Sequence, residues 1–164
     1  MYYRTTAVAA MLALAAGAAW SHGGSHENKA AAKPAQVSTE AHAFGRAGNP
    51  KKATRTIQVG MDDTMHFTPG DLVLKKGETV KFVVRNDGKI MHEMVIGTMK
   101  ELKAHAEVMR KFPNMEHDEP YMAHVAPGKT DDIVWQFTRA GEFFYACLIP
   151  GHLEAGMIAK ITVK

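Results

Sequence analysis

Short segments in which apolar and polar residues alternate, each ended by a turn, recur from residue 54 to the end of the chain. The segments that show this alternation are 56–59, 71–75, 79–85, 94–96, 133–138, 143–146 and 158–163. Successive side chains of a β-strand point to opposite faces of a sheet, so each segment can bury one face and expose the other. About seven or eight short strands of this kind predict an all-β fold in which two sheets pack as a sandwich.

Residues 98–112 break the β pattern and predict a single helix. Leu102, Ala106 and Met109 follow helical spacing, and Thr98 with Glu101 three residues later is typical of a capping box. Pro113 ends the pattern, because proline cannot continue a helix. We therefore expect one helical excursion between two strands.

Residues 1–21 are typical of a secretion signal peptide. Arg4 precedes an apolar run over 7–19, and small residues stand at 17–19, where a peptidase can cut. The run is short for a membrane span, which needs about 20 residues; a retained N-terminal anchor is the alternative. We expect a periplasmic chain with no stable membrane insertion after cleavage.

Residues 22–53 are predicted to form a flexible tail, with the folded domain spanning 54–164. The segment is rich in Ala, Gly, Lys and Ser, and Val37 and Phe44 are its only sizeable apolar residues. Such a composition buries too little surface to offset the loss of chain entropy. The segment contains three histidines, His22, His26 and His42. They are either ordinary solvated residues or a tract that binds metal weakly.

The charge balance excludes one class of partner. The formal net charge is only +3, and Lys and Arg do not cluster among aromatic residues. Nucleic-acid binding is therefore not expected.

The loop between the last two predicted strands carries Cys147, His152 and Met157 at five-residue steps. Cys147 is the only cysteine in the chain, so in an oxidising compartment it is buried and inert, linked to another chain, or bound to metal. A thiolate, an imidazole and a weak axial thioether, joined by a second imidazole, form the ligand set of a type 1 copper site. His92, after the turn at 86–88, is the candidate for that second imidazole.

The run Cys-Leu-Ile-Pro-Gly-His at 147–152, together with residues 86–93, resembles the cupredoxin family, and the loop is similar to that of azurin and auracyanin. The resemblance covers about 54–164 and implies a Greek-key sandwich holding one type 1 copper. It implies the ligands His92, Cys147, His152 and Met157. Within the family, residues 92–97 and the Met/His-rich excursion look most like the periplasmic copper-tolerance cupredoxins (CopI type).

Glu93 follows the first predicted histidine ligand. The family resemblance implies that a residue here, Asn in several relatives, ties the two ligand loops together. Glu93 either accepts backbone N–H bonds from the Cys147 loop or is a charged, exposed residue. We expect the tying role.

Methionine and histidine are concentrated between residues 91 and 124, which hold six methionines and four histidines. Thioethers suit Cu(I), and imidazole suits both copper oxidation states. A candidate second, weaker copper site comprises His105, Met109, Met115, His117, Met122 and His124. The alternative is that the methionines pack the core and the histidines are ordinary loop residues. Met61, Met65 and His66 are a less clustered candidate group.

Two functions follow from these residues. The first is copper tolerance, with copper ions bound at the type 1 site and a redox or copper-transfer protein as a candidate partner. The second is a soluble blue or green copper electron-transfer protein, with His152 as the exit point on an apolar patch. An enzyme is not expected, because copper oxidases and nitrite reductases need further copper sites, and this chain has no His-x-His pairs to build them.

Overall fold

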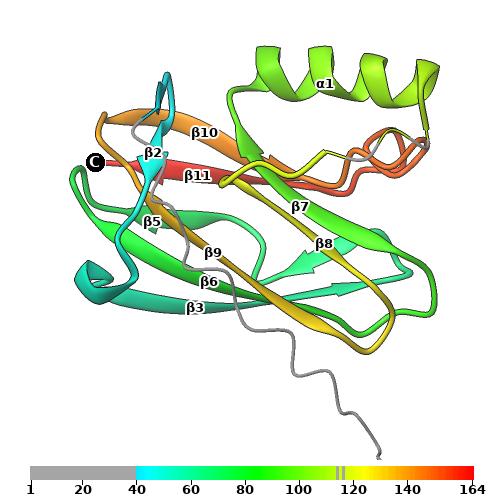
Figure 1. The fold of residues 1–164 in the computed structure, drawn as a ribbon, viewed down its shortest axis with the longest axis horizontal. Coiled ribbons are helices and arrows are strands. Elements are labelled where there is room, and N and C mark those ends of the chain that lie inside the picture. The colour runs from blue at the N-terminus through cyan, green and yellow to red at the C-terminus, as the bar shows by residue number, and fades with distance from the viewer. Residues whose placement is uncertain (1–39, 114, 116) are drawn as a thin grey trace, which may run out of the picture. The chain divides into compact units, whose positions relative to one another are not determined.

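The computed structural model describes residues 40–164 except 114 and 116. These residues form a sandwich of two β-sheets with one helix (Figure 1). One sheet has the order β1-β2-β9-β6-β3-β4 and the other the order β5-β11-β10-β7-β8. The strands of the first sheet are β1 (Ala41–His42), β2 (Gly45–Ala47), β3 (Arg55–Asp62), β4 (His66–Thr68), β6 (Thr79–Asn86) and β9 (Thr130–Gln136). Those of the second are β5 (Leu72–Leu74), β7 (His92–Gly97), β8 (Met122–Val125), β10 (Gly141–Ala146) and β11 (Ile158–Val163).

The core lies between the facing surfaces of the two sheets. In β6 the alternate residues Val80, Phe82 and Val84 are fully buried, as the sequence pattern predicts. From the neighbouring strand β9, Ile133 and Trp135 are buried in the same core cluster. The predicted all-β sandwich with one helical excursion is therefore confirmed.

Helix α1 (Met99–Lys111) contacts β7 and β10 and lies over the second sheet in Figure 1. Thr98 accepts from the backbone N–H of Glu101, whose side chain in turn accepts from the Thr98 backbone, so both halves of the predicted capping box form. Leu102 and Met109 are the buried residues of the helix. The helix therefore presents a narrow apolar stripe to the sheet.

Residues 40–53 differ from the prediction of a flexible tail. Strand β2 pairs antiparallel with β9, and the 3-10 helix η1 (Pro50–Lys52) follows it. Phe44 is only 2% exposed and stacks on Trp135 with ring centroids 5.1 Å apart, while Trp135 Nε1 donates to the carbonyl of Phe44 at 3.1 Å. Composition misleads here, because one aromatic side chain and a few backbone hydrogen bonds suffice to dock a polar segment. The predicted signal peptide and residues 22–39 lie outside the described residues.

His42 belongs to this docked segment and not to a solvated tract. Its ring lies 4.9 Å from that of Tyr121 and 5.2 Å from that of Phe44, measured between centroids. His42 is thus a packed aromatic neighbour. His22 and His26 lie outside the described part of the chain.

Four short strands of the described part of the chain were not predicted, namely β1, β2, β4 and β8, and the last of them shapes the site. Strand β8 pairs with β7 and places His124 opposite Glu93. It thereby joins the end of the helical excursion to the strand that begins with His92. In residues 40–164 other than 114 and 116, no helix has the length and apolar character needed to cross a membrane.

Candidate metal centre

His92 begins β7, and its side chain is fully buried. The loop before it is shaped by the buried side chain of Asn86. The Asn86 amide donates to the carbonyls of Ile90 and Val125, both at 2.8 Å, and its oxygen accepts from the backbone N–H of Gly88 at 2.8 Å. This network fixes where the chain turns back to deliver His92 to the core.

The second ligand loop joins β10 to β11, and backbone hydrogen bonds close it. The N–H of Cys147 donates to the carbonyl of Met157, and the N–H of Met157 donates to that of His152, each at 3.0 Å. Gly151 and Gly156 adopt φ of 93° and 96°, a left-handed conformation that favours glycine. Because both ends of the loop continue into paired strands, its three chemically active side chains are held in register.

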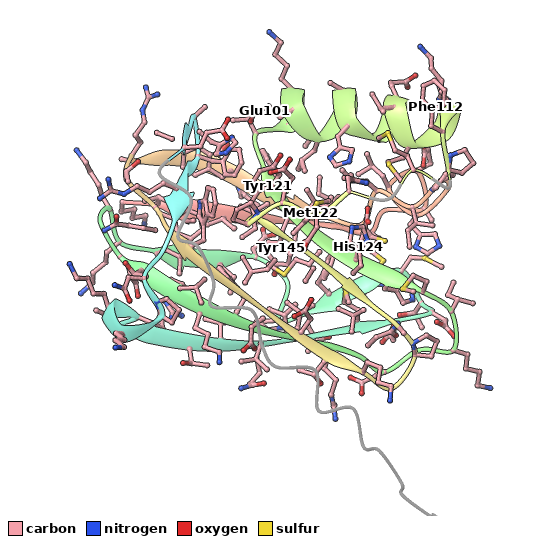
Figure 2. The ribbon with its side chains drawn as sticks, viewed as in Figure 1. Glu101, Phe112, Tyr121, Met122, His124 and Tyr145 are labelled. Carbon is pink, nitrogen blue, oxygen red and sulfur yellow. The ribbon has the colours of Figure 1, made fainter. Side chains whose placement is uncertain are left out.

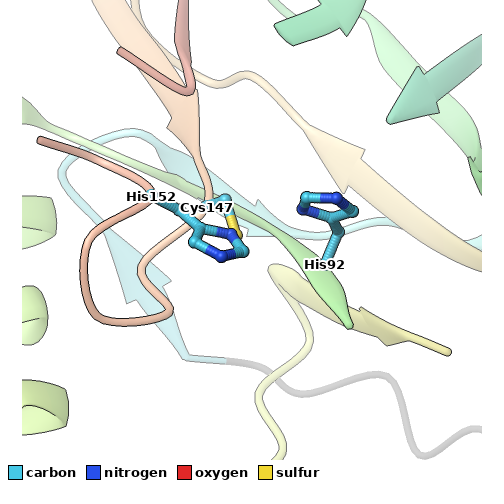
Figure 3. A group of neighbouring side chains, drawn as sticks. All are labelled: His92, Cys147 and His152. Atoms are coloured by element: carbon cyan, nitrogen blue, oxygen red, sulfur yellow. The ribbon is translucent and has the colours of Figure 1, made fainter. Parts of the chain in front are cut away.

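Three of the four predicted ligands meet. One donor atom each from His92, Cys147 and His152 lies within 4.8 Å of the others, and Figure 3 shows the three side chains facing one another. Cys147 Sγ lies 3.2 Å from His152 Nδ1, and the two imidazole centroids are 5.0 Å apart. Met157 is fully buried and belongs to the same core cluster as Cys147. These residues supply the two imidazoles, one thiolate and one thioether of a type 1 copper site.

One atom of His92 shows whether these residues fit copper, because it is buried and makes no hydrogen bond within the described part of the chain. His92 Nδ1 is buried and has no hydrogen-bond partner among the described residues, whereas Nε2 lies 3.1 Å from Asp63 Oδ1. A buried polar atom without a partner costs about 1–3 kcal/mol. A free imidazole lone pair beside a thiol and a second imidazole is the donor that copper needs, so the residues fit the metal.

Burial raises the pKa of the Cys147 thiol to about 12, although the N–H of Glu93, 3.5 Å from Sγ, acts in the opposite direction. The metal-free protein therefore keeps a neutral thiol at neutral pH. Metals bind the thiolate, so binding has to displace this proton.

Glu93 ties the two ligand loops together, as expected. Its side chain is 1% exposed, and Oε1 accepts from the backbone N–H of Leu148 at 2.8 Å. Its other oxygen lies 3.0 Å from His124 Nδ1. That contact raises the pKa of His124, with partial burial acting against it. Glu93 thus connects the Cys147 loop, the first histidine strand and β8.

The histidines of the Met/His-rich segment lie next to one another. His105 Nε2 and His117 Nε2 are 2.7 Å apart, and the His117 and His124 rings have centroids 5.4 Å apart. Burial, and then the nearby His117, lower the pKa of His105, which favours its neutral, metal-binding form. Within the described part of the chain, only His92, Cys147 and His152 bring three His, Cys, Asp or Glu donors within 4.8 Å.

The methionines of the predicted second site divide into two groups. Met109, Met115, His117 and His124 line one hollow of about 650 Å³ that also reaches Glu93 and the Cys147 loop. Met122 is 4% exposed and packs with Val95 and Leu102 in a separate apolar cluster; Figure 2 shows it with His124 on β8. Met122 therefore packs in the protein interior, which was the alternative to a role in copper binding.

The less clustered group at 61–66 has structural contacts. Met61 is buried in the core, and Met65 adopts a left-handed φ of 63° in the turn between β3 and β4. His66 Nδ1 lies 2.6 Å from the carbonyl of Thr64. These contacts account for the three residues without a metal.

Asp63 contacts His92, and the sequence pattern did not predict this contact. Its carboxylate accepts from the backbone N–H of Lys89 at 2.8 and 3.0 Å, and that N–H is the main cause of a lowered Asp63 pKa. An aspartate in a polar turn 29 residues before its partner carries no signal of this contact. Only the pairing of β3 with β6 brings the two together.

Residues 53–164 match the family of copper-binding proteins described as the plastocyanin/azurin family. The chain belongs to this family. A relative from Rubrivivax gelatinosus, named copper-resistant cuproprotein CopI, is 53% identical over 121 residues, 74% of this chain and 73% of that protein. A protein of the same name from Pseudomonas aeruginosa is 32% identical over 151 residues, covering 74% and 83%. Among solved structures, auracyanin B has a TM-score of 0.59 at 20% identity over 76% of this cupredoxin and 96% of that chain, so it shares the fold.

Proposed function

We propose that this cupredoxin is a periplasmic copper-resistance protein whose type 1 copper is held by His92, Cys147, His152 and an axial Met157. The observation that carries the proposal is the buried, unpartnered Nδ1 of His92 beside Cys147 and His152. Two relatives named copper-resistant cuproproteins support the resistance role.

Bound copper supplies a one-electron change between Cu(I) and Cu(II). The protein's part is to hold ligands that serve both states with little rearrangement, and to keep water away from them. Cys147 and Met157 are fully buried, and Leu148 beside them is 1% exposed. The proposed role is binding and buffering of copper, and it includes no enzymatic step.

The hollow lined by Met109, Met115, His117 and His124 is proposed as a second, weaker copper site, with His105 hydrogen-bonded to His117 at its edge. Soft thioethers and imidazoles together suit Cu(I). Glu93 lies at the wall of this hollow and contacts both His124 and the Cys147 loop. Copper captured here would therefore sit beside the type 1 centre.

A growth experiment tests the resistance role. A strain lacking the gene is grown over a range of copper concentrations and complemented with wild type or with Cys147→Ser. We expect the deletion to lower copper tolerance, wild type to restore it and Cys147→Ser to fail. Unchanged tolerance in the deletion strain contradicts the proposal.

Soluble electron transfer is the second candidate function. His152 is only partly buried, and the neighbouring loop exposes Ile90 and Met91, which are 43% and 46% exposed. An imidazole ligand beside an apolar surface suits brief docking of a redox partner. A respiratory defect of the deletion strain without added copper favours this role over resistance.

A further inference from the structure

We propose that Asp63 is the positioning residue of the copper site, acting on the metal through His92. Its carboxylate fixes the tautomer and orientation of the imidazole and favours bound Cu(II) over Cu(I). The inference rests on the proposed type 1 site and concerns a residue that is not itself a ligand.

The turn between β3 and β4 presents Asp63 in a fixed orientation. Asp62 accepts from the backbone N–H of Thr64 through its side chain at 2.9 Å and from that of Met65 through its carbonyl at 3.2 Å. Met65 closes the turn with its left-handed φ, and Asp62 pairs with His66 at the start of β4. Asp63 is therefore held at the tip of a closed hairpin.

Three donors converge on this one carboxylate, two from the loop before β7 and one from the first residue of that strand. They are the backbone N–H of Lys89 at 2.8 and 3.0 Å, the N–H of Ile90 at 3.4 Å and Nε2 of His92 at 3.1 Å. Gly88 lies against the same carboxylate, and a Cβ there would stand 2.0 Å from Asp63 Oδ1. Only glycine leaves room for this contact, so the loop is fitted to the aspartate.

The hydrogen bond to Asp63 decides which nitrogen of His92 faces the metal. A carboxylate accepts but cannot donate, so Nε2 carries the proton and Nδ1 keeps its lone pair. A 180° turn of the ring would put the carbon Cε1 where Nε2 now faces Asp63 and would lose this hydrogen bond. The buried, unpartnered Nδ1 is the expected counterpart of this arrangement.

The negative charge of Asp63 has a second effect. A carboxylate that accepts from a metal-bound imidazole makes the imidazole a stronger donor, and such partners typically contribute 10- to 100-fold in metal affinity. A stronger donor and a nearby negative charge stabilise Cu(II) more than Cu(I). The side chain of Asp63 is 39% exposed, so solvent screens part of this charge.

A structural role alone is the competing explanation, since Asp63 also caps the Lys89 and Ile90 N–H groups. Asp63→Asn separates the two roles, because the amide oxygen can still accept from His92 while the charge is lost. Asp87→Asn is the matched control. Asp87 pairs with Arg85 at 3.0 Å on the exposed surface, at the other end of the same loop, and contacts no proposed ligand.

The first experiment measures the Cu(II)/Cu(I) potential and the Cu(II) affinity of wild type, Asp63→Asn and Asp87→Asn. We expect Asp63→Asn to lose about tenfold in Cu(II) affinity relative to Cu(I), which raises the potential by about 59 mV. Asp87→Asn should stay close to wild type. Equal potentials in the two variants overturn the proposal. If copper-loaded wild type shows no intense visible band, the type 1 site itself is wrong. That outcome is distinct from equal potentials, which concern only the role of Asp63.

The second experiment uses the metal-free protein, so it does not depend on copper loading. Nitrogen-15 NMR of the His92 ring reports which nitrogen carries the proton. We expect wild type to hold the Nε2–H tautomer and Asp63→Ala to populate both tautomers, with a thermal scan to confirm that the variant is folded. If Asp63→Ala is unfolded, Asp63→Leu, whose side chain also cannot accept from His92, takes its place in the NMR comparison. A tautomer unchanged in the folded variant overturns the proposal.

Discussion

The carboxylate of Glu93 accepts a hydrogen bond from the backbone N–H of Leu148 at 2.8 Å, deep inside the protein. The two residues belong to different ligand loops, since Glu93 follows His92 and Leu148 follows Cys147. A hydrogen bond between the neighbours of two ligands therefore helps to fix the geometry of the centre.

Removing this bond should destabilise the metal-free protein. We expect Glu93→Ala to lower the free energy of unfolding by about 1–3 kcal/mol, because the Leu148 N–H is left buried without its partner. Glu93→Gln should lower the free energy of unfolding by less, since its amide oxygen can still accept from the Leu148 N–H. Urea unfolding measures the change, and Glu142→Ala at an exposed position is the control. A loss no larger than that of the control argues against the tying role.

The pair of Glu93 and His124 should make stability depend on pH. Contact with Glu93 raises the pKa of His124, so the folded state favours protonated histidine. The contribution is full below the ordinary histidine pKa of about 6.5 and is lost as pH rises through the raised folded-state value. We expect the difference in unfolding free energy between metal-free wild type and His124→Gln to shrink from pH 6 to pH 9. A difference that is constant with pH contradicts this account.

The hollow beside Glu93 should bind copper beyond the first equivalent. In a Cys147→Ser background, anaerobic Cu(I) titration against a competing chelator reports the second site alone. We expect Met115→Leu or His117→Asn to weaken this binding about tenfold or more, because each removes one soft or borderline donor. Met122→Leu, which changes a buried thioether in the neighbouring apolar cluster, should leave it unchanged. If neither Met115→Leu nor His117→Asn weakens Cu(I) binding relative to the Met122→Leu control, the proposed second site is wrong.

Residues 40–53 should contribute to the stability of the fold. We expect Phe44→Ala to lower the free energy of unfolding by about 3–5 kcal/mol, because it empties a buried site beside Trp135. Val73→Ala, at a position 58% exposed, should change it by no more than about 0.5 kcal/mol. Denaturant unfolding of both variants gives the comparison. Similar small effects would mean that the segment is only loosely docked.

The sequence predicts the sandwich and the ligand loop well, because both depend on local spacing. Alternation identifies β6 and β9, and the steps between Cys147, His152 and Met157 are set within one loop. Phe44 was missed because its burial depends on Trp135, which is 91 residues away. Asp63 was missed for the same reason: its role exists only once β3 and β6 pair. Met122 could not be separated from Met115 by spacing, since only the fold shows which thioether faces the hollow.

Visible absorption and EPR spectra of the Cu(II)-loaded protein test the central claim most directly. With Cys147 as a thiolate ligand, wild type should show an intense visible charge-transfer band and one bound Cu(II) with a type 1 EPR signal. Cys147→Ser should lose the band while the metal-free variant stays folded. A wild type without the band, or a Cys147→Ser variant with the same spectrum, would contradict the type 1 site.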